Sequence, residues 1–175
     1  MTHHHLDWRP EHLFRGYFDA TTPAVLEVDS SDEVTLDCLP ACTMEDLPPG
    51  HAKVLPAHLA ALDAHAGKMG PGPHFMTGPV HVRGAKPGDV LQVDILEASP
   101  MQDWGFTAIM PFLGALPDEY TNYQHLHIAI DRNAGTCTVP WGLTMPLDPF
   151  FGVMGVAPPN AWGRIGSPQP RGHGG

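Results

Sequence analysis

Short stretches in which apolar and polar residues alternate recur along the chain, and this period of two is typical of β-strands with one buried face. The alternation predicts one pair of strands at 25–28 and 33–38, around an Asp-Ser-Ser-Asp turn, and a second pair at 80–83 and 90–96. Because a short connection joins the members of each pair, we expect two similar β-hairpins.

The 90–96 segment reads Val-Leu-Gln-Val-Asp-Ile-Leu. Its odd positions Leu91, Val93 and Ile95 are expected to face the core, which places Gln92 and Asp94 on the opposite face. The sequence therefore predicts a half-buried strand here, with Asp94 in solvent unless another layer covers it.

One short helix is predicted at 56–66, where a proline near the start precedes alanine and leucine residues and a glycine follows. Three further strands are predicted, at 104–110, 125–130 and 136–140. The connections at 111–124 and 142–175 are long for a minimal sandwich, so we expect them to shape a site.

Glycine and proline, with 19 and 20 residues, are spread between these apolar segments. Frequent turns between short strands favour a mainly β fold over an α/β one. We expect a single domain over residues 1–175, a jelly-roll-like β-sandwich with one short helix and long Gly/Pro-rich loops.

Acidic residues outnumber basic residues by 19 to 9, which gives a formal net charge of -10. This charge repels phosphate groups, so it argues against nucleic acid or an anionic membrane as a partner and leaves small ligands open. No apolar run approaches the length of a membrane span and no signal peptide is readable, so we expect a cytoplasmic protein. The odd set of cysteines, Cys38, Cys42 and Cys137, predicts reduced thiols rather than a disulfide framework.

Twelve histidines are many for a chain of this length, so metal sites are the first functional class to consider. His125 and His127 point to the same side of a predicted strand and can offer two imidazoles to one ion, although a half-exposed strand face explains them equally well. His74 lies in a glycine-rich loop, where it can bind a metal or move a proton beside backbone amides. The alternative for His74 is a surface position in an ordinary turn.

Two other histidine sets have simpler explanations. His3, His4 and His5 lie near a start that we expect to be flexible, where they bind metals only loosely. His58 and His65 can share one face of the predicted helix, and we expect that face to be solvated. The sequence also contains no nucleophile elbow and no phosphate-binding glycine loop, which excludes the common serine hydrolases and nucleotide-binding proteins.

Four blocks of residues stand in a recognisable order and spacing. They are Gly-Tyr-Phe-Asp-Ala at 16–20, Thr-Gly-Pro-Val-His-Val-Arg-Gly-Ala-Lys-Pro-Gly-Asp-Val at 77–90, Asp-Trp-Gly-Phe-Thr-Ala-Ile at 103–109 and Pro-Phe-Phe-Gly-Val-Met-Gly-Val-Ala-Pro at 149–158. Together they closely resemble the acetamidase/formamidase family, and the resemblance covers nearly the whole chain. The second block is quite specific to that family.

The resemblance implies a β-sandwich hydrolase that acts on the carbon-nitrogen bonds of small linear amides such as formamide and acetamide. It would release ammonia and a carboxylate by means of a metal-activated water, with zinc as the expected ion and calcium as the alternative. Taken with the histidine pair described above, the candidate site consists of catalytic His74 and Asp103, substrate-binding Thr77, Gly78 and Trp104, and metal-binding His74, His125 and His127.

The family that the chain resembles continues past the final Gly-Gly with an acidic, histidine-bearing block that has no counterpart here. We therefore expect an N-terminal half of such an enzyme, which can be inactive by itself and is joined by a homo-oligomeric partner or a complementing C-terminal half. The alternative is a non-catalytic, amidase-like assembly or binding module completed by a partner chain, because an incomplete sheet exposes edges that pair with other strands. A sugar- or metal-binding β-sandwich is a third possibility, by fold analogy alone.

Overall fold

The computed structural model describes residues 1–51, 53–68, 72–166 and 173–174. The chain folds into two compact units. Unit 1 comprises Met1–Thr43, Pro56–Ala98 and Phe151–Gly175, and unit 2 comprises Met44–Leu55 and Ser99–Phe150. The expectation of a single domain over residues 1–175 stays a prediction.

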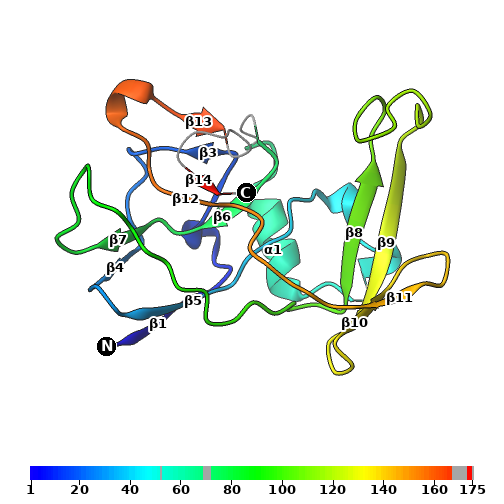
Figure 1. Ribbon diagram of the computed structural model, residues 1–175, viewed down its shortest axis with the longest axis horizontal. Coiled ribbons are helices and arrows are strands. Elements are labelled where there is room, and N and C mark those ends of the chain that lie inside the picture. Colours follow the sequence, from blue (N-terminus) through cyan, green and yellow to red (C-terminus); the bar gives the residue numbers. More distant parts are fainter. Residues whose placement is uncertain (52, 69–71, 167–172, 175) are drawn as a thin grey trace. The chain divides into compact units, whose positions relative to one another are not determined.

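Unit 1 consists mainly of short strands joined in pairs (Figure 1). Two of the pairs are parallel, β1 (His3–Leu6) with β5 (Glu33–Leu36) and β4 (Leu26–Val28) with β7 (Val80–Val82). Three are antiparallel, β2 (Leu13–Arg15) with β6 (Phe75–Thr77), β3 (Tyr17–Phe18) with β13 (Ile165–Gly166), and β12 (Met154–Gly155) with β14 (His173–Gly174). The turns η1 (Pro10–His12) and η4 (Asn160–Trp162) also belong to this unit.

The strands β4 and β5 form close to where the alternation predicts them, but the predicted hairpin between them is wrong. The turn itself exists, since the N–H of Asp32 donates to the carbonyl of Asp29 at 3.1 Å. Each strand nevertheless pairs with a remote parallel partner, β4 with β7 and β5 with β1. Which distant strand a strand pairs with is decided by tertiary packing, and the residues of the local turn do not encode it.

The predicted second hairpin is also wrong, because residues 90–96 form no strand in the structure. The side chains of Leu91, Val93 and Ile95, which the alternation assigns to the core, are exposed. The period of two is typical of a strand, but a strand also needs a neighbouring strand that pairs with its backbone N–H and C=O groups. The described part of the chain supplies no such neighbour for residues 90–96.

The single helix, α1 (Pro56–Ala64), matches the predicted helix and ends two residues earlier. Its Ala/Leu composition favours helix, and Gly67, at φ +72°, follows the turn that closes it. Ala61 and Leu62 are buried in the core of unit 1 together with side chains from the strands, Leu6, Leu13, Phe18, Val28, Phe75 and Met76.

The expectation of a solvated face with His58 and His65 is wrong, because the two residues are 0% and 8% exposed. His58 Nε2 lies 3.4 Å from the Cys42 thiol, and its ring packs 5.7 Å from that of Trp8. His65 Nε2 lies 3.1 Å from the Pro10 carbonyl oxygen. Each imidazole is therefore a core side chain whose polar atom has a protein partner, which is the condition for burying it.

The expectation of a flexible N-terminus is likewise wrong, since His3–Leu6 is the strand β1. The imidazoles are bonded to the neighbouring segment, His4 Nε2 to Asp32 Oδ2 at 3.2 Å and His5 Nε2 to Asp37 Oδ1 at 2.9 Å. These side-chain contacts, to residues just before and just after β5, stabilise the pairing of β1 with β5.

Unit 2 is built on a four-stranded antiparallel sheet in the order β11-β10-β9-β8. Its members are β8 (Trp104–Ile109), β9 (Gln124–Asp131), β10 (Thr136–Thr138) and β11 (Thr144–Pro146), and the unit also holds η2 (Met44–Asp46) and η3 (Pro49–His51). Figure 1 shows β8 and β9 as a long twisted pair, with the 111–124 connection at its tip. The predicted strands at 104–110, 125–130 and 136–140 are confirmed, whereas β11 lies inside a stretch for which the sequence predicts a loop.

The prediction of a mainly β chain with one short helix is confirmed. No helix in the described part of the chain is both long and apolar enough to span a membrane. The three cysteines form no disulfide bond among the described residues; Cys42 is buried and Cys38 is exposed.

Candidate functional site

His74 immediately precedes β6 in unit 1 and is half-buried. Its carbonyl accepts the N–H of Gly16 at 3.0 Å, which fixes the backbone at the entrance to the strand. Burial lowers the pKa of the His74 imidazole, so the ring favours the neutral form that binds metals and accepts protons. Gly70 and Pro71, which belong to the predicted loop, lie outside the described residues.

Thr77 and Gly78, the predicted substrate-binding residues of this loop, make hydrogen bonds within unit 1. The Thr77 hydroxyl donates to the carbonyl of Asp37 at 2.6 Å, and the N–H of Gly78 donates to the carbonyl of His12 at 2.9 Å. Gly78 has φ +135°, a conformation that residues with a Cβ rarely adopt. These bonds hold the end of β6 to Asp37 and to η1, and the N–H of Gly78 already has an acceptor.

His125 and His127 stand together in unit 2, on the same side of β9, as the strand period predicts. Their ring centroids are 4.7 Å apart, and the ring of Phe106 on β8 stacks on His125 at 4.9 Å with an interplanar angle of 17°. The diagonal arrangement of Phe106 and His125 across the two strands allows this stacking. The hairpin therefore places both imidazoles in contact with each other and one of them against Phe106.

The imidazole nitrogens differ in their bonding. His127 Nε2 lies 3.0 Å from the carbonyl oxygen of Asp46, and His125 Nδ1 lies 3.2 Å from the Tyr123 hydroxyl and 3.5 Å from Asp46 Oδ1. His125 Nε2 is buried and has no hydrogen-bond partner in the part of the chain that the structure describes. A ligand that reached this nitrogen would meet no competing protein partner among the described residues.

A complete metal site is not assembled by the residues that the structure describes. Among residues 1–51, 53–68, 72–166 and 173–174, no group of three or more His, Cys, Asp or Glu side chains could hold an ion. His74 belongs to unit 1 and the histidine pair to unit 2. The predicted ligand set of His74, His125 and His127 therefore stays a prediction.

Asp103 and Trp104, adjacent in the sequence, have different surroundings in unit 2. Asp103 Oδ1 accepts a hydrogen bond from Arg132 Nε at 2.7 Å, and both side chains are about half exposed. Trp104 is buried, with its ring 6.4 Å from that of Phe106. Asp103 also lines a cavity of about 260 Å³ together with Lys53, Ile130, Asp131, Arg132 and Asn133.

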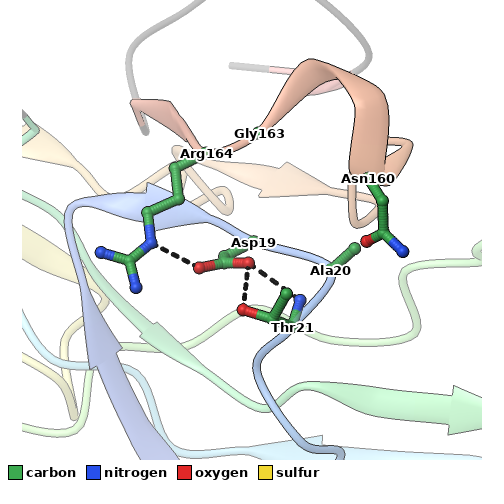
Figure 2. Close-up of a pocket in the computed structure, with 6 residues that line it drawn as sticks. All are labelled: Asp19, Ala20, Thr21, Asn160, Gly163 and Arg164. Atoms are coloured by element: carbon green, nitrogen blue, oxygen red, sulfur yellow. Dashed lines mark hydrogen bonds and ion pairs between the residues drawn. The ribbon is translucent and has the colours of Figure 1, made fainter.

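A second cavity, of about 170 Å³, lies in unit 1 and was not predicted. It is lined by Asp19, Ala20, Thr21, Asn160, Gly163 and Arg164. Figure 2 shows the Asp19 carboxylate between the side chains of Arg164 and Thr21, with Asn160 on the far side of Ala20. The sequence signal that was present is Asp19 within the Gly-Tyr-Phe-Asp-Ala block; its partner Arg164 is 145 residues away and no local pattern connects the two.

The Asp19 carboxylate is fixed by several bonds. Thr21 donates to Asp19 Oδ1 through its N–H at 2.8 Å and its hydroxyl at 2.7 Å, and Arg164 Nε donates to Oδ2 at 2.6 Å. The Thr21 bonds, followed by Arg164, hold the pKa of Asp19 below its usual range, so the carboxylate is a poor proton acceptor. The two charged side chains that line the cavity, Asp19 and Arg164, are therefore bonded to each other.

Comparison with known proteins gives one family match. A sequence model described as "Acetamidase/Formamidase family" matches residues 16–163. A candidate formamidase of Schizosaccharomyces pombe and a formamidase of Methylophilus methylotrophus are each 45% identical to this chain over 38 residues. That stretch is 21% of this chain and 9% of each relative, so the chain matches only a small share of the relatives' length.

Proposed function

Since the chain belongs to the acetamidase/formamidase family, we propose that it is a hydrolase of small linear amides of the formamide and acetamide type. The single observation that carries the proposal is the family match over residues 16–163. In the reaction, the oxygen of water bonds to the amide carbonyl carbon, the carbon-nitrogen bond breaks, and the nitrogen takes up a proton and leaves as ammonia. The remaining product is a carboxylate.

His74 is our candidate for the group that moves the proton. A neutral imidazole can accept a proton from the attacking water and return it to the leaving nitrogen. Support comes from its partial burial, which lowers its pKa, and from the backbone bond between Gly16 and His74 that fixes its position. Asp103, held by Arg132, remains the second proposed catalytic residue, with Thr77, Gly78 and Trp104 as proposed walls of the substrate pocket.

A divalent ion, zinc or calcium, remains part of the proposal because of the family resemblance. The residues of unit 2 fit such an ion incompletely. His125 Nε2 is buried and has no hydrogen-bond partner among the described residues, but His127 Nε2 is close to the Asp46 carbonyl oxygen. No third ligand completes a metal site among the described residues. We therefore derive no catalytic step through a metal.

The proposal is tested by measuring ammonia release from formamide and acetamide, with metal analysis of the same protein sample. We expect release, and we expect His74→Asn to reduce it by about 10²–10⁴-fold, the usual contribution of a general acid-base group. His81→Asn is the matched control, because His81 is an exposed histidine on the nearby strand β7. The proposal fails if metal-loaded protein, supplied with the remaining part of a related formamidase, releases no ammonia.

The alternative is a non-catalytic, amidase-like module that binds a partner chain. The observation that favours it is the row of exposed apolar side chains between 90 and 96, in a segment whose backbone forms no hydrogen bond with the described residues. A chain that releases no ammonia yet binds the complementing part of a relative would support this alternative.

A further inference from the structure

The histidine pair of unit 2 contacts η2, a turn that lies far from it in the sequence. Asp46, the last residue of η2, is 81 residues before His127, and its carbonyl oxygen lies 3.0 Å from His127 Nε2. Its carboxylate oxygen Oδ1 lies 3.5 Å from His125 Nδ1, and the Asp46 and His125 side chains are 23% and 16% exposed. One residue of the earlier segment therefore contacts both imidazoles, at a place largely shielded from water.

The contact with the carbonyl oxygen decides which nitrogen of His127 carries a proton. A carbonyl oxygen only accepts hydrogen bonds, so His127 Nε2 is the donor in this bond. A metal ion binds an imidazole through a nitrogen that has no proton, because the ion takes the lone pair. An ion could therefore bind His127 Nε2 only if the hydrogen bond to Asp46 were first broken.

The same bond joins two parts of unit 2 that are separate in the sequence, Met44–Leu55 and Ser99–Phe150. Polar contacts between these parts lie near both ends of the shorter one. Near one end Asp46 meets the histidine pair, and at the other the N–H of Leu55 donates to Gln102 Oε1 at 3.0 Å. The bond from His127 is therefore one of those that hold Met44–Leu55 in the unit.

We propose that His127 is a positioning residue that joins Met44–Leu55 to the β8–β9 hairpin, and that the histidine pair is not the metal site of the proposed reaction. His125 belongs to the same joint, since its ring stacks on Phe106 at 4.9 Å and its Nδ1 faces the Asp46 carboxylate. The inference concerns only which residues could hold an ion. It neither requires nor excludes amide hydrolysis by this chain.

The remaining nitrogen of the joint does not make a metal site by itself. His125 Nε2 is buried and has no hydrogen-bond partner among the described residues. Protein sites for zinc use three or four side-chain ligands, and no group of three His, Cys, Asp or Glu side chains in the described part of the chain could hold an ion. This disagreement with the predicted ligand set has a physical reason, because the strand period aligns the two rings but does not show which nitrogens are already bonded.

Glutamine at position 127 separates the two possible roles of the histidine. Its side-chain N–H can replace the imidazole Nε2–H as the donor to Asp46, but glutamine is not among the usual ligands of zinc. We expect amide hydrogen exchange in Met44–Leu55 to keep its wild-type rate in His127→Gln. In His127→Ala it should become roughly two- to tenfold faster, the effect of losing one hydrogen bond. His81→Ala, at an exposed histidine of unit 1, should leave this exchange unaltered.

Calorimetric titration of the whole chain with zinc chloride is the second measurement. If the pair were the metal site, His127→Gln would weaken zinc binding by about tenfold or more, as removal of a ligand does. We expect wild type, His127→Gln and the control His81→Gln to have the same zinc affinity within about twofold, whatever zinc the other histidines bind.

The proton on His127 can be observed directly. Long-range ¹H–¹⁵N NMR spectra distinguish a ring nitrogen that carries a proton from one that does not, and the signals that disappear in His127→Gln are those of His127. We expect a proton on Nε2 at neutral pH, without added metal and with it.

Three results would overturn the proposal. They are a zinc affinity that falls about tenfold or more in His127→Gln, a His127 Nε2 without a proton, and wild-type exchange of Met44–Leu55 in His127→Ala. If His127→Ala does not fold, the zinc titration and the NMR spectra still decide the question. None of these measurements uses ammonia release, so failure of the proposed amide hydrolysis would leave their result standing.

Discussion

Asp32 is the residue that joins the N-terminus to the turn between β4 and β5. Its Oδ1 accepts the N–H of Thr2 at 2.6 Å, and its Oδ2 accepts the N–H of Asp29 at 3.0 Å and lies 3.2 Å from His4 Nε2. The N–H of Asp29, then that of Thr2 and the His4 imidazole, lower the pKa of Asp32 to about 2. The folded state therefore strongly favours the ionised form of Asp32, and this charge stabilises the position of β1.

Asp32→Asn should lower the stability of the protein at neutral pH, because asparagine replaces one carboxylate acceptor by an amide donor. The pKa is depressed on folding from 3.8, so the stabilisation is fully present above about pH 5 and is lost as the pH falls from about 4 toward 2. The difference in urea midpoint between wild type and variant should therefore be constant near neutrality and shrink in acid. Glu97→Gln, an exposed acid-to-amide change, should show no such difference.

His58 makes the second residue-scale prediction, because it is fully buried between Cys42 and Trp8. His58→Ala leaves a cavity and should lower the free energy of unfolding by about 2–5 kcal/mol, the range for truncation of buried side chains of similar size. Urea denaturation followed by tryptophan fluorescence reports the change, since Trp8 contacts the site. His81→Ala should be nearly neutral; an equal loss in both variants would contradict the assignment of His58 to the core.

The positions of most strands and of the helix were predicted from the sequence, whereas the pairing of strands remote from each other in the chain was not. The β9–β10 hairpin follows from alternation on both sides of a turn, and α1 from a proline start and a glycine after its end. The pairing of β4 with β7 depends on segments more than fifty residues apart, and so does the contact between Asp19 and Arg164. The histidines of the predicted site came from their local sequence context and its other residues from family blocks, because no single-sequence pattern shows which loops meet.

The β9–β10 turn gives a prediction at the scale of the element. Asp131 Oδ1 accepts the N–H of Asn133 at 3.0 Å and that of Ala134 at 2.9 Å, which fixes the turn before β10. Asp131→Ala removes both bonds and should cost about 1 kcal/mol, with faster amide hydrogen exchange in β9 and β10. Asp148→Ala, a matched change at an exposed aspartate, should leave exchange in these strands unaltered.

At the scale of the whole molecule, chain composition and family membership restrict function in different ways. The net charge of -10 repels phosphate groups, and the family match supports the proposal of amide hydrolysis. The two groups of proposed site residues lie in separate units, His74 with Thr77 and Gly78 in unit 1 and the histidine pair in unit 2.

The Asp19–Arg164 pair ties the last part of the chain to one of its first strands. Arg164 Nε donates to the Asp19 carboxylate at 2.6 Å, and its guanidinium lies 5.3 Å from the Tyr17 ring. The next residues form β13, which pairs with β3. The Asp19 side chain is only 11% exposed, whereas the Arg164 side chain is 63% exposed. The carboxylate of this ion pair is therefore shielded from solvent, and the guanidinium is not.

Arg164→Gln should release this part of the chain locally without unfolding unit 1. Chymotrypsin cleavage after the exposed Trp162 should become at least about twofold faster, since cleavage of a locally opened segment follows the population of the open form. Salt should raise the wild-type rate toward that of the variant, because it screens the ion pair. Arg83→Gln, which breaks the surface pair with Asp29 instead, should leave the cleavage rate after Trp162 unchanged. If both variants are cleaved at the wild-type rate, the pairing of β3 with β13 is enough to hold this segment. The ion pair would then line the cavity without stabilising this part of the chain.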